Sequence, residues 1–237
     1  MPTVLFTRSI DDTHKQKLAI AGFEVIEHNL LTINALPNAT SLILKELPHF
    51  KNLVFTSQHA VRIFFDVLNA RHIVIDTSIK IFSTSGETKN LLEKYGYSPT
   101  LSAHAAEPLA HLMLEKAHLT EGVHFICGNL SLPILPNILL ENGVFLKKIM
   151  VYETIKHPLS ILPSERVFDA VVFFSLSAAD AFLIDNNLEE ITIVFTLGAT
   201  TANYIKEKTG IKSIFMAEKP TIESLIQMIE GVFNDKK

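Results

Sequence analysis

The sequence predicts an α/β protein made of two similar lobes, each a mostly parallel sheet flanked by helices. Short apolar runs alternate with helical patterns along nearly the whole chain, and part of this pattern occurs twice. Hydrophobic residues make up 48% of the chain and charged residues only 19%, which fits parallel strands that are buried on both faces. Strand–helix alternation implies right-handed crossovers between parallel strands.

The expected strands are short apolar segments, and helices fit between most of them. One helix is capped by Asp11 or Asp12 and ends at Gly22, and two others end at Gly96 and Gly210. A capping residue at the start and a glycine at the stop are the usual helix signals. The strands are expected at residues 3–7, 23–27, 52–56, 80–83, 124–127, 144–151, 169–174, 191–196 and 212–216.

Two segments in the first part of the chain each have a similar counterpart further on, and the two counterparts follow in the same order. Residues 55–64 align with 173–182, and each passes from an apolar strand through a serine into a helix with Ala and Phe on one face. Residues 81–88 align with 194–201 at similar spacing. A pair of similar lobes explains this duplication better than one continuous sheet.

Two connectors divide the chain, one at residues 30–37 and the other at 153–163. We therefore expect a discontinuous lobe of residues 1–33 plus 158–237 and a second lobe of residues 37–153. Because clefts at domain interfaces favour binding, the ligand is expected between the lobes.

Charge and cysteine content exclude several classes of function. The net charge is −4 and no Lys/Arg cluster is present, which argues against nucleic acid. The longest apolar runs, such as residues 170–174, are far shorter than the roughly 20 residues of a membrane span. The N-terminus lacks a secretory signal, so a cytoplasmic protein is expected. Cys127 is the only cysteine, which leaves no intramolecular disulfide or cysteine-rich metal site.

The candidate site lies where strands pass into helices. Familiar phosphate, dinucleotide, hydrolase and zinc-protease signatures are absent. Ligands of open α/β sheets bind outside the carboxyl ends of the strands, and helix N-termini favour anions. Ordinary N-capping is the alternative interpretation. The residues at these junctions are Thr56, Ser57, Ser85, Thr88, Ser175, Gly198, Thr200 and Thr201.

Two further residues are candidates by position. Arg8 directly follows the first strand, and its fixed charge suits carboxylate recognition; a surface salt bridge is the alternative. Tyr152 ends the strand that enters the second connector, where its phenol would donate to a ligand or anchor the hinge. The evenly spaced His104, His111 and His118 are interpreted as a solvated helix face.

Five motifs in order resemble uroporphyrinogen-III synthase across essentially the whole chain. They are Thr-Arg at residues 7–8, Gly before a strand at 22–25, Phe-Thr-Ser-x-x-Ala-Val at 55–61, Val-Tyr-x-Thr at 151–154 and Gly-x-Thr-Thr-Ala at 198–202. Three departures concern substrate contact. Ser85 stands where the family has Gly, an Arg is missing beside Cys127 and Gly128, and Leu176 stands where the family often has Pro.

The resemblance implies a bilobal fold with a two-stranded linker, no metal or organic cofactor, and hydroxymethylbilane, a linear tetrapyrrole with eight carboxylates, as the substrate. Loss of the substrate hydroxyl gives an azafulvene. Attack through the substituted carbon of ring D gives a spiro intermediate, and fragmentation and re-closure yield uroporphyrinogen III with ring D inverted. Tyr152 would be the proton donor, while Arg8, Ser57, Ser175 and the threonine pair would hold carboxylates.

The resemblance also sets the expected partners. It implies a monomer whose small-molecule substrate is handed over transiently by the preceding pathway enzyme, with no nucleic acid or membrane partner. A non-catalytic bilobal module that binds anions or tetrapyrroles is the alternative. An assay with hydroxymethylbilane distinguishes the two, because the substrate cyclises unaided to the type I isomer.

Overall fold

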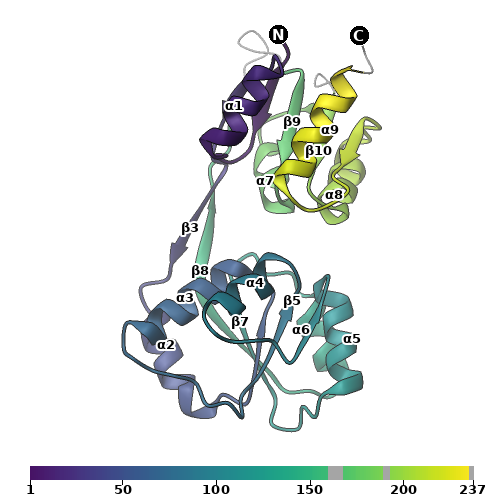
Figure 1. Cartoon of the computed structure of the whole chain (residues 1–237). Helices are drawn as coiled ribbons and strands as arrows, with labels where there is room; N and C mark the ends of the chain where they lie inside the picture. The colour runs from purple at the N-terminus through teal and green to yellow at the C-terminus, as the bar shows by residue number, and fades with distance from the viewer. Residues whose placement is uncertain (160–167, 189–192, 235–237) are drawn as a thin grey trace. The chain divides into compact units, whose positions relative to one another are not determined.

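The protein is seen in a computed structural model that describes residues 1–159, 168–188 and 193–234. The chain divides into two compact units (Figure 1). Unit 1 consists of Met1–Thr32 with Ile155–Lys237, and unit 2 consists of Ile33–Thr154. Each unit contains its own sheet flanked by helices, so the predicted α/β fold with two mostly parallel sheets is confirmed.

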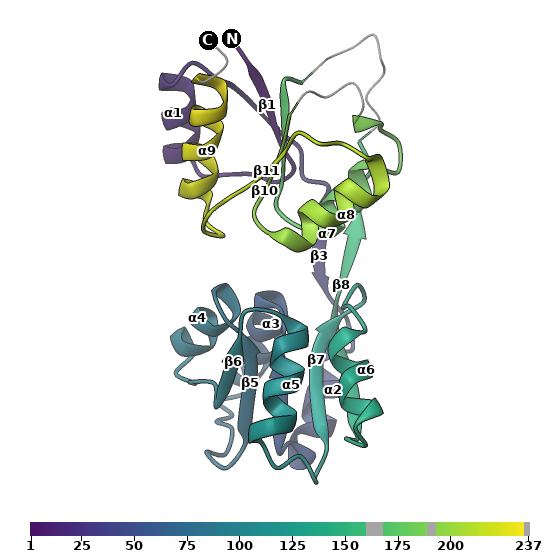
Figure 2. The ribbon, with the colours of Figure 1, turned by 90° about the vertical axis from the view of Figure 1, so that its right-hand side faces the viewer.

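The sheet of unit 1 has the strand order β11-β10-β9-β1-β2, and all its neighbouring strands are parallel. Helices α1 and α9 pack on one face, and α7 and α8 pack on the other (Figure 2). The elements are β1 (Thr3–Phe6), α1 (Asp12–Ile20), β2 (Glu24–Glu27), β9 (Ala170–Phe173), α7 (Leu176–Phe182), β10 (Ile193–Thr196), α8 (Ala199–Thr209), β11 (Ile214–Met216) and α9 (Ile222–Asn234).

The sheet of unit 2 has the order β3-β8-β7-β4-β5-β6. Helices α2, α3 and α4 cover one face, and α5 and α6 cover the other. The elements are β3 (Leu31–Ala35), α2 (Ala39–Glu46), a 3₁₀ turn (Leu47–His49), β4 (Asn52–Phe55), α3 (Gln58–Asn69), β5 (Lys80–Thr84), α4 (Glu87–Lys94), β6 (Leu101–Ala103), α5 (Ala106–Lys116), β7 (Val123–Gly128), α6 (Ile134–Glu141) and β8 (Leu146–Lys156).

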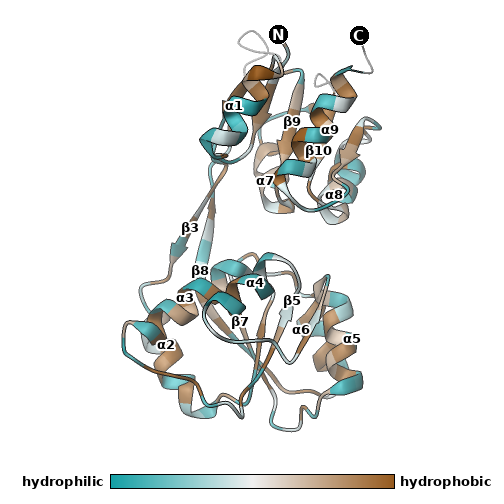
Figure 3. Ribbon diagram, in the orientation of Figure 1, coloured by the Kyte–Doolittle hydropathy of each residue, from teal (hydrophilic) through white to brown (hydrophobic). Residues whose placement is uncertain are grey.

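The central strands are apolar because both of their faces are covered (Figure 3). Leu53 and Phe55 of β4 pack against the helices on one face of the sheet. Val54, between them, packs against the helices on the other face. This alternation explains why β4 reads as an unbroken hydrophobic run in the sequence.

The predicted start and stop signals of three helices are confirmed. Asp11 caps α1 by accepting a hydrogen bond from a backbone N–H of the first turn. Gly22, Gly96 and Gly210 all have positive φ angles just after their helices, the conformation that glycine adopts most easily. Over the part of the chain that the structure describes, no helix has the length and apolarity needed to cross a bilayer.

The structure adds two strands to those expected and shifts the bounds of a third. The predicted connector at residues 30–37 contains β3, which is hydrogen-bonded to β8. Strand β6, whose three residues are all half-buried, was not predicted. Strand β8 begins later than expected and continues to Lys156, into the predicted second connector. The end of that connector, at residues 160–163, and the first two residues of the strand predicted at 191–196 lie outside the described residues.

An ion pair in unit 2 between the buried Glu46 and the exposed Lys147 gives a test of the fold. Glu46 is 6% exposed and accepts a hydrogen bond from the Lys147 ammonium at 2.6 Å. This bond, only partly opposed by desolvation, lowers the pKa of Glu46 from its ordinary 4.5. A lowered folded pKa stabilises the protein above the unfolded pKa, and the stabilisation is lost as pH falls through the folded pKa.

Glu46→Gln should therefore lower the free energy of unfolding by about 1 kcal/mol near pH 7. The difference from wild type should shrink as the pH falls below about 4.5, as measured by urea unfolding at several pH values. Glu93→Gln, which alters an exposed pair with Lys89, is the matched control and should change stability by less than about 0.5 kcal/mol. A Glu46→Gln effect that stays constant down to low pH would contradict this prediction.

Candidate active site

The strand order of each sheet reverses once, and such a reversal marks the place where open α/β sheets bind ligands. In unit 1 the reversal lies between β1 and β9, because β2 lies beyond β1 while β10 and β11 lie beyond β9. In unit 2 it lies between β4 and β7, with β5 and β6 on one side and β8 on the other. The residues that follow these strands are therefore the first candidates for ligand contact.

At the reversal in unit 2, Ser57 and Tyr152 are in contact. Ser57 is the N-cap of α3, and its hydroxyl oxygen accepts a hydrogen bond from the backbone N–H of His59 at 3.2 Å. The Tyr152 hydroxyl donates to the same oxygen at 3.0 Å. A serine that follows β4 and a tyrosine of β8 thus form one hydrogen-bonded cluster, although 95 residues separate them in sequence.

The position of Tyr152 depends on an irregularity between β7 and β8. Cys127 pairs with Met150, whereas Gly128 pairs with Tyr152, so Val151 is an extra residue on β8. A bulge of this kind re-aims a side chain and is common beside active sites. The Tyr152 ring lies directly against Gly128, where a Cβ atom would overlap its ring carbons. Glycine at position 128 therefore makes room for the ring.

Burial controls the acidity of Tyr152, which is only 8% exposed. Desolvation raises the pKa of the phenol above its ordinary value of 10.0, and the hydrogen bond to Ser57 opposes this change only in part. The hydroxyl therefore keeps its proton at neutral pH. It can serve as a hydrogen-bond donor or a general acid, but not as a base.

The second junction of unit 2 is shaped by glycine rather than serine. Gly86, with φ of 74°, is the N-cap of α4, whereas Ser85 is exposed and its backbone N–H donates to the Ala103 carbonyl at 2.7 Å. Gly198 is the N-cap of α8. Gly86 and Gly198 thus both occupy an N-cap position, although their backbone conformations differ.

The remaining predicted residues of unit 2 differ in accessibility. Thr56 is half-buried directly after β4. Thr88 is 6% exposed in the first turn of α4, so its side chain belongs mostly to the packed interior. Beside it, Glu87 accepts a hydrogen bond from the Gln58 side chain at 2.6 Å. This contact ties the N-termini of α3 and α4 together.

At the reversal in unit 1, Arg8 lies over an aromatic ring. Its guanidinium carbon is 4.1 Å from the centroid of the Phe174 ring, a cation–π contact. The salt bridge considered for this exposed arginine is not found with any residue that the structure describes. Ser175 follows Phe174 and caps α7 with its hydroxyl. Arg8 thus contacts the residue that directly precedes the α7 cap.

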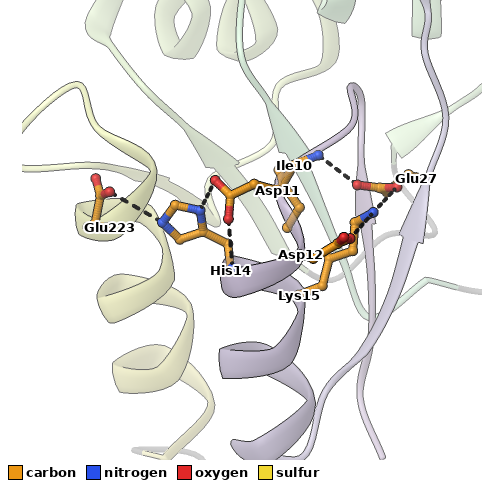
Figure 4. A network of polar contacts seen from close by, with 7 residues as sticks. All are labelled: Ile10, Asp11, Asp12, His14, Lys15, Glu27 and Glu223. Carbon is orange, nitrogen blue, oxygen red and sulfur yellow. Dashed lines mark hydrogen bonds and ion pairs between the residues drawn. The ribbon is translucent and has the colours of Figure 1, made fainter.

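Polar contacts fix the loop that leads from the first strand into α1 (Figure 4). The backbone N–H of Ile10 donates to the Glu27 carboxylate at 2.6 Å. Asp11 caps α1 and also contacts the ring of His14, whose other nitrogen is 3.3 Å from Glu223 of α9. The backbone hydrogen bond at the cap lowers the pKa of Asp11. These contacts attach the loop to β2 and α9.

The last predicted junction precedes α8. The backbone of Gly198 is extended, with φ of −161°. Thr200 is exposed, whereas Thr201 is 7% exposed. Within this pair only Thr200 offers a readily accessible hydroxyl, and the backbone N–H groups of the first helical turn are the other donors at this end of the helix.

A separate cavity of about 440 Å³ in unit 1 contains none of the predicted residues. Within it, the Asp180 carboxylate accepts hydrogen bonds from Lys156 and Tyr204. These contacts satisfy much of the polar lining internally. The cavity is lined by Asp180, Leu183, Ile184, Asn186, Asn187, Tyr204, Lys208 and Thr209.

Sequence reasoning missed three residues of the unit 2 cluster. The His59 ring packs edge-on against the Tyr152 ring, and Gly128 makes room for that ring. Asn129 accepts a hydrogen bond from the Thr154 backbone N–H at 2.7 Å and donates to the Thr154 carbonyl at 3.2 Å, which holds β8 in place after the bulge. The sequence signal that could have identified Gly128 and Asn129 is a Gly-Asn pair at the end of a buried strand.

These features define a class of protein: a two-unit, doubly wound α/β protein with basic and hydroxyl groups at the strand-order reversals and a protonated phenol beside one of them. Among the described residues, no group of three or more His, Cys, Asp or Glu side chains is arranged to hold a metal ion. The family model of uroporphyrinogen-III synthase HemD matches residues 12–227. The chain belongs to this family, as the sequence predicts, and is a cyclising lyase of heme biosynthesis.

Solved structures agree with this assignment. A mutant uroporphyrinogen III synthase from the extremely thermophilic bacterium Thermus thermophilus matches with a TM-score of 0.77 at 15% identity, over 99% of this chain and 100% of that chain. The wild-type form of that protein matches with a TM-score of 0.61 at 15% identity, over 100% of this chain and 99% of that chain. A uroporphyrinogen-III synthetase from Helicobacter pylori 26695 matches with a TM-score of 0.62 at 25% identity, over 98% of this chain and 100% of that chain.

Proposed function

We propose that the chain converts hydroxymethylbilane to uroporphyrinogen III with Tyr152 as the proton donor. The Tyr152 proton and the substrate hydroxyl leave together as water, and an azafulvene forms. The substituted carbon of ring D attacks this electrophile to give a spiro intermediate, which fragments and re-closes with ring D inverted. A proton released in the final step restores the phenol, so atoms and charges balance over the cycle.

The contact between Tyr152 and Ser57 supports this role. A general acid must hold a proton at working pH and present it at a fixed position. Burial keeps the phenol of Tyr152 protonated, and the Ser57 oxygen and the Gly128 backbone fix its place. The site also lies at a strand-order reversal. The proposal rests on this one observation: the Tyr152 phenol is protonated and held at a fixed position beside a strand-order reversal.

The carboxylates of the substrate would be held by donors at the strand ends of both units. Thr56, Ser57, Ser85 and Thr88 would act for unit 2, with exposed Ser85 better placed than buried Thr88. Backbone N–H groups at helix N-termini supply further donors. Unit 1 would contribute Arg8, Ser175, Gly198, Thr200 and Thr201.

Positioning is the main task of such a site, because the substrate closes without help to the uninverted isomer. We propose that the two units correspond to lobes of residues 1–33 plus 158–237 and 37–153. We also propose that the chain acts as a cytoplasmic monomer that receives hydroxymethylbilane from the preceding enzyme of the pathway.

The direct test is an assay of the purified protein with freshly prepared hydroxymethylbilane, followed by chromatographic separation of the oxidised product isomers. The type III isomer is expected to predominate. A product mixture identical to that formed without protein would show that the chain only binds tetrapyrroles, the alternative function.

The threonine pair before α8 gives a second test. The double substitution Thr200→Ala and Thr201→Ala should lower kcat/KM about tenfold through lost carboxylate contacts. It should change the free energy of unfolding by about 1 kcal/mol or less, since both substitutions are small. The single variants should separate the accessible Thr200 from the buried Thr201. Unchanged kinetics in the double variant would remove this junction from the site.

A further inference from the structure

The side chain of Asn129 continues the pairing of β7 with β8 one residue beyond the end of β7. The backbone N–H of Asn129 donates to the Tyr152 carbonyl at 3.2 Å. Its side-chain oxygen accepts from the backbone N–H of Thr154 at 2.7 Å, and its side-chain nitrogen donates to the Thr154 carbonyl at 3.2 Å. A residue of a parallel strand likewise donates to one residue of its neighbour and accepts from the residue two further on. In Asn129 the side-chain oxygen takes the place of the backbone carbonyl.

These bonds lie just past the bulge in β8. Val151 and Tyr152 are consecutive, yet both belong to the same buried cluster, on the side of the sheet that α2, α3 and α4 cover. Consecutive residues of a regular strand point to opposite faces, so both face this cluster because Gly128 pairs with Tyr152 instead of Val151. If the pairing continued without the bulge, the Tyr152 ring would turn toward α5 and α6, away from Ser57.

The register of β8 past the bulge therefore decides where the Tyr152 hydroxyl lies. Before the bulge, five residues of β7 pair with β8 in an unbroken series, whereas after it β7 offers only Gly128. Without the Asn129 side chain, that one pair would have to hold the shifted register on this edge of β8. Because Thr154 is the last residue of unit 2, no later residue of β8 within the unit can take over this task.

We propose that Asn129 is a positioning residue for the proton donor: its carboxamide holds the β8 bulge in place and so keeps the Tyr152 hydroxyl beside Ser57. The inference rests on the proposed function, in which Tyr152 protonates the substrate hydroxyl. Asn129 is exposed, and in water such hydrogen bonds largely replace bonds to solvent, so their main effect is on geometry. An amide suits this role, since the Thr154 N–H requires an acceptor and the Thr154 carbonyl a donor.

The first test is kinetic. Asn129→Ala should lower kcat about tenfold through misplacement of the phenol, while the KM for hydroxymethylbilane stays within about twofold of wild type. Asn129→Asp should lower kcat at least as much, because a carboxylate cannot donate to the Thr154 carbonyl. In a Tyr152→Phe background, Asn129→Ala should cause no further fall in kcat, because a residue that acts through the phenol has nothing left to position.

The second test is spectroscopic and does not depend on turnover. The chain has four tyrosines and no tryptophan, so the tyrosine band of its near-UV circular dichroism spectrum has no indole contribution. The difference between wild type and Tyr152→Phe gives the part of this band that is due to Tyr152. Asn129→Ala should lose most of that part, since a ring without fixed surroundings gives little signal.

The matched control is Asn142→Ala. Asn142 is also exposed in unit 2, and its side chain donates to the Ile138 carbonyl at 2.9 Å. Because this bond lies at the end of α6, away from β8, the variant should keep the wild-type kcat and tyrosine band.

Three results would overturn the inference. They are an equal fall in kcat when Asn129→Ala is made in wild type and in Tyr152→Phe, an unchanged Tyr152 band in Asn129→Ala, and a lower urea-unfolding midpoint with kcat unchanged, which would assign Asn129 a purely structural role. If wild type yields only the type I isomer, the proposed function fails, while the tyrosine band still decides whether Asn129 positions Tyr152.

Discussion

Gly128→Ala is expected to lower the rate at which the type III isomer forms by about 100-fold or more. A Cβ atom at this position would overlap the ring of Tyr152, so the ring must move away. The displaced hydroxyl would lose its 3.0 Å contact with Ser57. A displacement of about 1 Å of a catalytic group costs on the order of 100-fold in rate. The measurement is kcat with hydroxymethylbilane, together with the ratio of the two product isomers.

The same substitution should also destabilise unit 2. Overpacking a filled interior costs about 1–3 kcal/mol, and this effect must be separated from the loss of catalysis. The double variant Gly128→Ala with Tyr152→Ala provides the separation, because removal of the ring leaves room for the new Cβ. It should regain much of the stability lost in Gly128→Ala without regaining activity. Stability is measured by urea unfolding.

Gly231→Ala is the matched control for the glycine substitution. Gly231 lies within α9, and a Cβ built there meets no other atom within 4 Å. This variant should keep full activity and become slightly more stable, because alanine favours the helix by about 1 kcal/mol over glycine. Wild-type activity in Gly128→Ala would show that the ring can shift without consequence, and the proposed role of this contact would be wrong.

The fold was largely predictable because its central strands are buried on both faces. Segments such as β4 and β9 are fully buried, and a sequence pattern identifies them directly. The strands that were missed lack this property. Strand β3 is mostly exposed and contains Thr32 and Asn34, while β6 has three half-buried residues. Their formation depends on hydrogen bonds to a neighbouring strand, which a local pattern does not encode.

Two capping serines at the strand–helix junctions were predictable from the sequence, but the contacts around them were not. The capping roles of Ser57 and Ser175 follow from local chemistry, since serine before a helix is a preferred cap. The position of Tyr152 against Gly128 instead depends on the bulge in the pairing of β7 with β8. Likewise, the contact of Arg8 with Phe174 joins residues that are brought together by the pairing of β1 with β9. Register between distant strands is a tertiary property, so these contacts required the structure.

Tyr152→Phe is expected to slow the reaction about 100-fold without abolishing it, the usual contribution of a general acid. Phenylalanine keeps the ring against Gly128, so the shape of the site is retained. The lost hydrogen bond to Ser57 should cost about 1 kcal/mol of stability. The residual rate would come from positioning of the substrate, so the type III isomer should still predominate over type I.

The pH dependence of kcat separates proton donation from packing. Burial raises the pKa of Tyr152 above 10.0, and for a neutral acid this means that the proton is retained to higher pH. Wild-type kcat should therefore show no loss attributable to Tyr152 below about pH 10, and Tyr152→Phe should lower kcat by the same factor throughout that range.

Ser57→Ala keeps the phenol while it removes the acceptor and the helix cap, so it should cost about 1 kcal/mol of stability but less activity than Tyr152→Phe. Equal kcat values for Tyr152→Phe and wild type would exclude the phenol as the proton donor and leave donation to the substrate or to water.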